Sequence, residues 1–391
     1  MKLPLALVTC ALCTTLLAHA AEPIARSQAG ASLRHEIQLA IDKGVAWLKT
    51  TQRPDGSFAN PESDQNAKDH PALTALPITA LLRDPSAKTD PLPPPVATAL
   101  GFLRSKAKPD GGIYEKGLSN YNTSVSLVAL LEGNQPGDEP LIEAARRFIA
   151  GQQATSMVRP ELNGGFGYGP TGASPKRMHP DLDNTLITLE ALRAYKEARP
   201  AKELAAGPDL NWQAAIDFVA RCQNLTSNGQ PWANEDPGNK GGFIYYPGFS
   251  NAGEQDLPDG KKALRSYGSM TYAGLLSFIY ADVKKDDPRV VAALEWLQRH
   301  YTLAENPGLE RQGYFYYLHL LTKGLAASGV KTLKTAGGKE VDWAREVALQ
   351  LINLQNGNGS WVNDTARWME KDPVLVTSYA ILALEILHRR M

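Results

Sequence analysis

The sequence predicts an all-α protein built as a single (α/α)6 toroid, a closed ring of six helical hairpins. Three observations predict it. A segment with an aromatic-aliphatic pair, a glutamine and a glycine turn recurs along the chain. The helix in each copy is amphipathic, whereas the helix that follows is apolar on nearly every side. Such hairpins bury their faces only against neighbouring hairpins, and a closed ring leaves none of them without a neighbour.

The repeated segment is clearest in its first copy. The pair Trp47-Leu48 leads to Gln52, and the turn at Gly56 is followed by Phe58. Shorter matches lie at 102–114, 148–166, 218–243, 296–301 and 351–361. Glycine permits a tight turn and an aromatic ring can pack back on the helix pair, so we expect the turn aromatics to be structural clips.

The second helix of each unit shares a spacing of its own. A residue with a small hydroxyl side chain stands seven positions before a leucine, two helical turns away on the same face. The pairs are Thr74 and Leu81, Thr123 and Leu130, Thr185 and Leu192, Ser269 and Leu276, and Thr377 and Leu384, with Tyr314 and Leu321 in the fifth unit. We expect these helices to form the inner layer of the ring.

Residues 1–20 are predicted to be a signal peptide. Lys2 precedes an apolar stretch that runs to Leu17, and Ala18 and Ala20 are small residues of the kind that signal peptidase reads. The stretch is too short to cross a bilayer. We therefore expect an exported protein, periplasmic or extracellular, with an N-terminal extension over 21–33 and the toroid over 34–391.

Charge and cysteine content exclude several classes of function. The 391 residues include 41 basic and 41 acidic side chains, which gives no reason to expect nucleic acid as a partner. Contact with a membrane surface stays open, and the oligomeric state is not predicted. Cys222 is the only cysteine after the signal peptide, so an internal disulfide and a cysteine-rich zinc site are excluded. No metal and no cofactor is expected.

The first copy of the repeat resembles the QW-type repeat of squalene and oxidosqualene cyclases, with Lys43, Trp47, Gln52, Gly56 and Phe58 at matching positions. The chain also resembles the β-subunits of protein prenyltransferases. The resemblance covers most of residues 34–390 and implies the toroid. Squalene cyclases carry two such barrels, whereas this chain has one. The zinc site of the prenyltransferases includes an Asp and a Cys, and no Asp-x-Cys pair occurs here.

One stretch is similar to the Asp-x-Asp-Asp-Thr acid motif of class II terpenoid cyclases. It begins at Asp181, and its match implies that Asp183 is the proton donor, whereas Asn184 departs from the motif. Asp183 would lie at the start of an inner helix, whose dipole stabilises a carboxylate after proton loss. Asp181, Asn184 and His179 are near enough in sequence to hydrogen-bond to it. The competing interpretation is a helix cap, because the equivalent segment around Tyr121 holds no acid.

An apolar cavity with aromatic walls would stabilise the carbocations of a cyclase reaction through the faces of the rings. The candidate lining residues are Tyr267, Tyr272, Tyr314, Tyr316, Tyr317 and His319. They stand near the starts of the fourth and fifth inner helices. For His319 the competing interpretation is a hydrogen-bonded core residue.

A second candidate site combines aromatic rings with carboxylates, as sugar-binding proteins do. It comprises Trp361, Asp364, Trp368 and Asp372. The competing interpretation is that the Asp residues cap turns and the Trp residues are clips. The sequence therefore favours a cyclase-like protein that cyclises or binds an isoprenoid in the ring. A carbohydrate-active enzyme, a sugar-binding toroid and a scaffold without chemistry stay open, and the partner is an apolar small molecule or a glycan.

Overall fold

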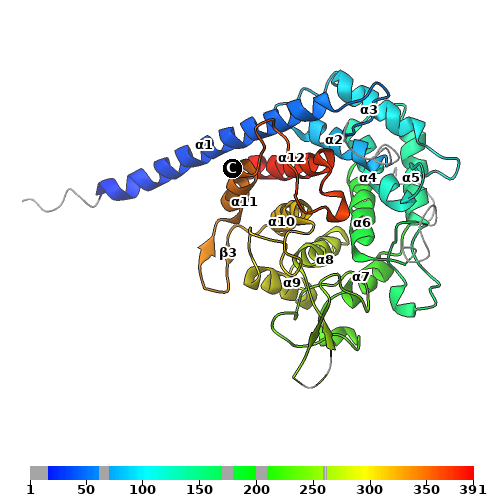
Figure 1. Cartoon of the computed structure of the whole chain (residues 1–391), viewed down its shortest axis with the longest axis vertical. Helices are drawn as coiled ribbons and strands as arrows, with labels where there is room; N and C mark the ends of the chain where they lie inside the picture. Colours follow the sequence, from blue (N-terminus) through cyan, green and yellow to red (C-terminus); the bar gives the residue numbers. More distant parts are fainter. Residues whose placement is uncertain (1–15, 61–69, 170–178, 200–208, 259, 261) are drawn as a thin grey trace, which may run out of the picture.

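The computed structural model describes residues 16–60, 70–169, 179–199, 209–258, 260 and 262–391, with side chains from residue 30 onward. Its helices form two concentric layers (Figure 1). The inner layer holds α2 (Ala72–Arg83), α4 (Ser119–Gly133), α6 (Leu182–Glu197), α8 (Gly268–Tyr280), α10 (Tyr314–Ser328) and α12 (Pro373–Arg390). The outer layer holds α1 (Leu16–Thr50), α3 (Pro94–Ser105), α5 (Glu139–Ala150), α7 (Trp212–Arg221), α9 (Pro288–Arg299) and α11 (Trp343–Asn353).

The inner helices close into a ring. Each of them packs on the next inner helix along the chain, and α12 returns to pack on α2. The first helix joins the closure, because α1 packs on both α12 and α11. The predicted all-α class and the single (α/α)6 toroid are therefore confirmed, with the more uniformly apolar helices inside.

Burial follows the patterns that the sequence shows. The inner helix α8 is buried from Gly268 to Phe278 without a break. The outer helix α5 buries residues along one face, among them Ile142, Ala145 and Ile149, and turns its other face to solvent. An outer helix thus needs only one apolar stripe, whereas an inner helix packs on neighbours on both sides.

The glycine turn is the joint between neighbouring hairpins. Gly56 has a φ of +89°, and a Cβ at this position would lie 2.4 Å from the carbonyl oxygen of Thr98 in α3. Gly359 repeats this geometry, with a φ of +93° and a Cβ that would lie 2.5 Å from the carbonyl oxygen of Lys43 in α1. Only glycine allows the turn to approach the next outer helix so closely.

The glutamine of the repeat links each turn to the following outer helix. Gln52 Nε2 donates to the carbonyl oxygens of Gly56, at 3.2 Å, and Pro95, at 2.7 Å. Gln355 Nε2 makes the corresponding bonds to Gly359 and Ala40, both at 2.9 Å. Since Ala40 belongs to α1, the last hairpin is tied to the first in the same way.

The hydroxyl side chains of the inner helices accept hydrogen bonds from the turns. Thr74 Oγ1 accepts from the Phe58 backbone N–H, and Thr377 Oγ1 accepts from that of Trp361. In the fourth unit the acceptor is Thr271, which is bonded by Phe243 N–H. Ser269, which stands seven residues before Leu276, does not make this contact, and its Oγ accepts from Asn306 Nδ2 at 3.1 Å instead.

Short strands and 3-10 turns occupy the loops. β1 (Glu254–Asp256) pairs with β2 (Lys262–Leu264), and β3 (Leu333–Lys334) pairs with β4 (Glu340–Val341), both antiparallel. The 3-10 turns are η2 (Pro160–Leu162), η5 (Thr226–Asn228) and η6 (Arg367–Met369). None of these elements belongs to the ring.

The N-terminal prediction lies largely outside the described residues. Residues 1–15 are not described, so a signal peptide over 1–20 and an extension over 21–33 stay predictions. Helix α1 begins at Leu16, and its first part extends away from the ring (Figure 1). Among the described helices, none combines the length and apolar character that crossing a membrane requires.

Candidate functional site

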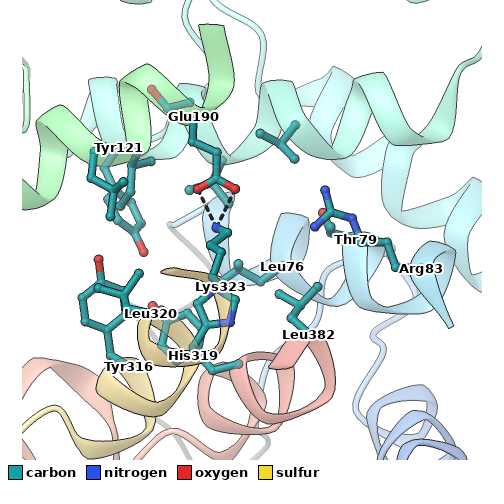
Figure 2. Close-up of a pocket in the computed structure, with 16 residues that line it drawn as sticks. Leu76, Thr79, Arg83, Tyr121, Glu190, Tyr316, His319, Leu320, Lys323 and Leu382 are labelled. Carbon is teal, nitrogen blue, oxygen red and sulfur yellow. Dashed lines mark hydrogen bonds and ion pairs between the residues drawn. The ribbon is translucent and has the colours of Figure 1, made fainter. Parts of the chain in front are cut away.

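The inner helices enclose a cavity of about 70 Å³ in the ring lumen (Figure 2). One group of lining residues is aromatic, with Tyr121, Tyr316, His319 and Tyr379, and another is charged, with Arg83, Glu190 and Lys323. Leucine, isoleucine and valine side chains from α2, α4, α6, α10 and α12 fill the wall between them. The lumen is thus an apolar space with phenol groups and an ion pair on its walls.

Asp183 and Tyr316 meet across this lumen. Asp183 is the second residue of α6, and its Oδ1 accepts a hydrogen bond from the hydroxyl of Tyr316 in α10. Burial raises the pKa of Asp183 to about 6, and the bond from Tyr316 opposes that rise. A carboxyl group with this pKa is partly protonated near neutral pH, which suits a general acid.

Asp181 takes the capping role at the start of the same helix. Its Oδ1 accepts from the backbone N–H of Asn184 at 2.8 Å, and its Oδ2 accepts from Asn184 Nδ2 at 2.8 Å. Asp181 is fully buried, and burial together with the nearby charge of Asp183 raises its pKa well above the ordinary range. The two carboxyl groups therefore differ in environment, since Asp183 is only partly buried.

A second side-chain contact, an ion pair, crosses the lumen further along α6 and α10. Lys323 Nζ lies 2.6 Å from both carboxylate oxygens of Glu190. The side chains of Glu190 and Lys323 are only 19% and 15% exposed, so the pair is largely removed from water. Glu190 lies on α6 and Lys323 on α10, the same two helices that carry Asp183 and Tyr316.

The aromatic side of the lumen is a connected cluster. The hydroxyls of Tyr121 and Tyr379 are hydrogen-bonded to each other, and burial raises the pKa of Tyr121 to about 12. The Tyr379 ring lies 5.5 Å from that of Tyr316 and stacks at 5.4 Å on His319. These phenols stay neutral and present ring faces to the cavity.

His319 lines the cavity and is 7% exposed. Its Nδ1 has no hydrogen-bond partner among the described residues. Burial, together with the positive charges of Lys323 and Arg83, holds its pKa well below the ordinary value. The ring is therefore neutral at physiological pH, and one of its nitrogens is buried without a partner among the described residues.

Glu370 was not among the residues expected from the sequence. Its carboxylate is 1% exposed and accepts hydrogen bonds from the backbone N–H of Tyr316, at 2.7 Å, and from Asn363 Nδ2, at 2.6 Å. It thereby caps α10 and fixes the start of the helix that carries Tyr316. No sequence signal reveals this cap, because Glu370 lies 54 residues from Tyr316 along the chain.

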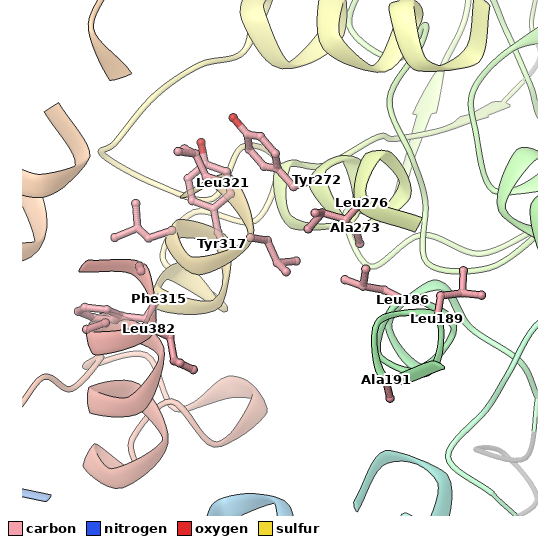
Figure 3. Packing of buried hydrophobic residues seen from close by; sticks show 14 of the residues in the cluster. Leu186, Leu189, Ala191, Tyr272, Ala273, Leu276, Phe315, Tyr317, Leu321 and Leu382 are labelled. Atoms are coloured by element: carbon pink, nitrogen blue, oxygen red, sulfur yellow. The ribbon is translucent and has the colours of Figure 1, made fainter. Parts of the chain in front are cut away.

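Most other predicted lining residues lie away from the cavity. Tyr272 and Tyr317 pack together between α8 and α10, with ring centres 5.8 Å apart (Figure 3). Tyr314 donates its hydroxyl to the Leu303 carbonyl oxygen and accepts from Gln350 Nε2 at 2.9 Å, so it joins α10 to the outer layer. Tyr267 accepts from Asn251 Nδ2 at 3.2 Å.

His179 also lies apart from the Asp183 carboxyl. Its ring lies 4.1 Å from that of Tyr246, and its Nδ1 lies 3.2 Å from the Pro180 carbonyl oxygen. Of the residues that the sequence proposed, Tyr316 and His319 line the cavity, and Tyr316 binds Asp183, which is not itself a lining residue. Asp181 and Asn184 bind each other at the start of α6.

The residues proposed for sugar binding have separate roles. Trp361 is fully buried, and its Nε1 donates to the Leu351 carbonyl oxygen at 2.8 Å. Asp372 is the N-cap of α12 and accepts from the Val374 backbone N–H at 2.8 Å. Asp364 and Trp368 are exposed, the latter by 43%. Two of the four residues are thus built into the fold, as the competing interpretation proposed.

No group of three or more metal-ligating side chains occurs in the described part of the chain. Among the titratable residues that line the cavity, Glu190 pairs with Lys323, Arg83 pairs with Glu132 outside the lining, and the tyrosines and His319 stay neutral. A reaction that uses only these side chains is therefore one of proton transfer and charge stabilisation.

No protein-family model and no curated protein matches the chain. Solved structures do match it over most of its length. A variant of the type II terpene cyclase MstE from Scytonema, in complex with the product merosterolic acid A, is 14% identical with a TM-score of 0.54, over 92% of this chain and 99% of that one. A second variant of MstE, in complex with the substrate geranylgeranyl dihydroxybenzoate, gives the same values.

A glycoside hydrolase matches to a similar degree. The GH76 α-mannanase BT2949 from Bacteroides thetaiotaomicron is 12% identical with a TM-score of 0.55, over 90% of this chain and 96% of that one. The chain therefore shares its helical toroid with both kinds of enzyme, and the choice between their chemistries rests on the site.

Proposed function

We propose that the ring lumen is the site of an acid-initiated reaction on an isoprenoid, with Asp183 as the proton donor. The observation that carries the proposal is the Asp183 carboxyl group, whose pKa burial raises to about 6 and which Tyr316 holds beside an aromatic lumen. The MstE complex supports the isoprenoid class, because a cyclase with the same toroid takes a geranylgeranyl compound as its substrate.

The reaction begins when protonated Asp183 gives its proton to one carbon of an alkene, whose π electrons form the new C–H bond. The cation on the other alkene carbon is then attacked by a second double bond of the chain, which forms a C–C bond. A proton leaves a neighbouring carbon for the Asp183 carboxylate or a water molecule. The product is thus an isomer of the substrate, and the neutral rings of Tyr121, Tyr316 and Tyr379 stabilise the cations.

Glycoside hydrolysis has less support. It requires two accessible carboxyl groups about 5 to 9.5 Å apart. Asp181 is fully buried as a cap, and Glu190 is held by Lys323. Glu190 also lies seven residues after Asp183, which places it about 10 Å further along the axis of α6. One carboxyl group without a cationic partner, held by the neutral phenol of Tyr316 beside an apolar space, suits alkene protonation better.

The test is a turnover assay of the purified protein at pH 5.5 with linear isoprenoids of increasing length, in which isomeric products are separated by gas chromatography and mass spectrometry. We expect the protein to convert at least one compound and Asp183→Asn to convert none. Asp364→Asn is the matched control, since Asp364 is an exposed loop residue. An active Asp183→Asn variant, or no conversion of any compound, would contradict the proposal.

We further propose that residues 1–20 direct export of the chain. Expression of the whole chain in a bacterial host, followed by fractionation and N-terminal sequencing, tests this. A protein that starts near Ala21 in the periplasm or medium is expected. A cytoplasmic protein that retains residues 1–20 would contradict it.

A further inference from the structure

Two contacts bridge the lumen between α6 and α10, although α8 stands between these helices in the ring. Tyr316 binds Asp183, and Lys323 binds Glu190. In both pairs the partners are 133 residues apart along the chain, so the second contact follows the first by seven residues on each helix. Seven residues span about 10 Å of helix. The contacts are therefore two parallel bridges, about 10 Å apart along the ring axis.

Four residues of α10 line the cavity, two of which form the bridges and two of which stand between them. Tyr316, His319, Leu320 and Lys323 follow one another at helical spacing and all line the cavity. On the facing helix, Leu186 and Ile187 form the wall between the bridges. Figure 2 shows the Glu190–Lys323 pair crossing this space, with Tyr121 and Tyr316 on one side of the pair and Arg83 on the other.

We propose that the Glu190–Lys323 ion pair is the floor of the substrate site and limits the substrate to a short prenyl chain of about two isoprene units. This inference rests on the proposed function, because it places the reacting alkene beside Asp183. With C–C bonds of about 1.5 Å, each bond of a zigzag chain advances about 1.3 Å. About eight carbons therefore reach from the first bridge to the second, which is the backbone of a ten-carbon prenyl alcohol.

The cavity is small, so a prenyl chain of any length must displace lining side chains, and a longer chain must displace more of them. The cavity encloses about 70 Å³, whereas an apolar cavity of about 150 Å³ takes up benzene. Even a ten-carbon chain must displace lining side chains such as Leu186 and Leu320. A chain of twenty or thirty carbons must also separate Glu190 from Lys323, which leaves two charges without partners away from water.

His319 indicates what polar group the ligand carries between the two bridges. His319 lines the cavity, and its Nδ1 is a buried atom without a hydrogen-bond partner among the described residues. A hydroxyl group can donate to this nitrogen or accept from it, so it satisfies either tautomer of a neutral imidazole. An alcohol suits this position better than a carboxylate, because Lys323 is already neutralised by Glu190.

The experiment measures binding of prenyl alcohols with 5, 10, 15 and 20 carbons by isothermal titration calorimetry. We expect the protein to bind the ten-carbon alcohol at least about tenfold more tightly than the twenty-carbon one. In the double variant Glu190→Leu/Lys323→Leu the floor is removed without leaving a lone charge. Binding of the twenty-carbon alcohol should then improve at least about tenfold.

Two further variants keep the test decisive. Arg193→Leu/Asp282→Leu removes an ion pair on the molecular surface and should leave the length preference unchanged. Ile187→Phe narrows the space between the bridges and should weaken binding of the ten-carbon alcohol, which tests the site even where the double variant does not fold. A folded double variant with the original preference, or unchanged binding in Ile187→Phe, would overturn the proposal.

The same series separates this inference from the proposed function. Binding of an alcohol does not require a proton from Asp183, so Asp183→Asn should keep the length preference while it loses turnover. Suppose that the double variant changes the length preference and Asp183→Asn is still active. The inference about the Glu190–Lys323 pair would then stand, and the proposal that Asp183 is the acid would be refuted.

Discussion

At the scale of single residues, two aspartates in one helical turn have different partners and different burial. The sequence left open whether the Asp183 region is a cap or an acid. In the structure, the Asp181 carboxylate binds the N–H and the amide of Asn184, whereas the Asp183 carboxyl faces Tyr316. The sequence could not reveal this division, because Tyr316 lies 133 residues away and joins Asp183 only through ring closure.

Asp183→Asn should stabilise the protein at high pH. Burial raises the pKa of Asp183 from 3.8 to about 6, so the folded chain binds this proton more tightly than the unfolded chain. The native protein therefore loses stability as the pH rises from about 4 to about 6, and the loss persists above. After allowance for partial exposure, we expect the variant to gain about 1–2 kcal/mol more at pH 8 than at pH 4. Urea denaturation of both proteins at pH 4 and pH 8 measures this gain. Equal gains at the two pH values would contradict a raised pKa of Asp183.

Tyr316→Phe should move the pH dependence of turnover upward. The Tyr316 hydroxyl stabilises the charged form of Asp183, so its removal raises the Asp183 pKa further above its ordinary range. The acid then stays protonated to higher pH, and the pH at which the rate falls by half should rise by about one unit. Tyr272→Phe, which removes a buried phenol outside the cavity, is the control. A profile that does not move would show that Tyr316 does not act on Asp183.

At the scale of elements, the repeat predicted from the sequence corresponds to a real joint. The glycine and the glutamine of the repeat hold each turn to the next outer helix. The hydroxyl of the following inner helix accepts a hydrogen bond from a backbone N–H of the turn. The pattern pointed to Ser269, seven residues before Leu276, whereas the hydroxyl that accepts from the turn is that of Thr271, seven residues before Phe278. It also placed Tyr314 and Tyr317 in the cavity, whereas their hydroxyls bind the carbonyl oxygens of Leu303 and Thr302.

Gly56→Ala should be strongly destabilising. The backbone there has a φ of +89°, and the new Cβ would lie 2.4 Å from the Thr98 carbonyl oxygen. We expect a loss of about 2–4 kcal/mol of unfolding free energy from strain and the steric clash. Gly101→Ala in α3 is the control, because a Cβ there meets nothing within 4 Å. That variant should gain about 0.5–1 kcal/mol, as alanine does inside a helix. Thermal unfolding of both variants measures these changes. Similar changes in stability would contradict the claim that the turn requires glycine at position 56.

At the scale of the whole molecule, closure of the ring creates the site. The lumen residues come from α2, α4, α6, α10 and α12, which span almost the whole chain. Sequence periodicity predicted six hairpins and their inner faces, because burial leaves a pattern. It could not predict the two bridges between α6 and α10, or the Glu370 cap on α10, because these depend on the register of helices that are not neighbours.

Gln355→Ala should destabilise the protein as much as Gln52→Ala. Gln355 ties the last hairpin to α1, and Gln52 ties two consecutive hairpins through equivalent bonds. In a closed ring both losses weaken the same cooperative unit, by about 1–2 kcal/mol each. An open array would instead fray at its ends. Chemical denaturation of both variants measures the two losses of unfolding free energy. An unchanged unfolding free energy in Gln355→Ala would contradict closure of the ring.

The most direct test of Asp183 as the proton donor is turnover in D2O with the isoprenoid that the protein converts. The Asp183 carboxyl exchanges with solvent, so each turnover should place one deuterium on the carbon that is protonated first, and the product should gain about one mass unit. Asp183→Asn should form no labelled product. Product without deuterium would contradict acid initiation by this residue. Labelled product from Asp183→Asn, formed as fast as by the protein with Asp183, would also contradict it.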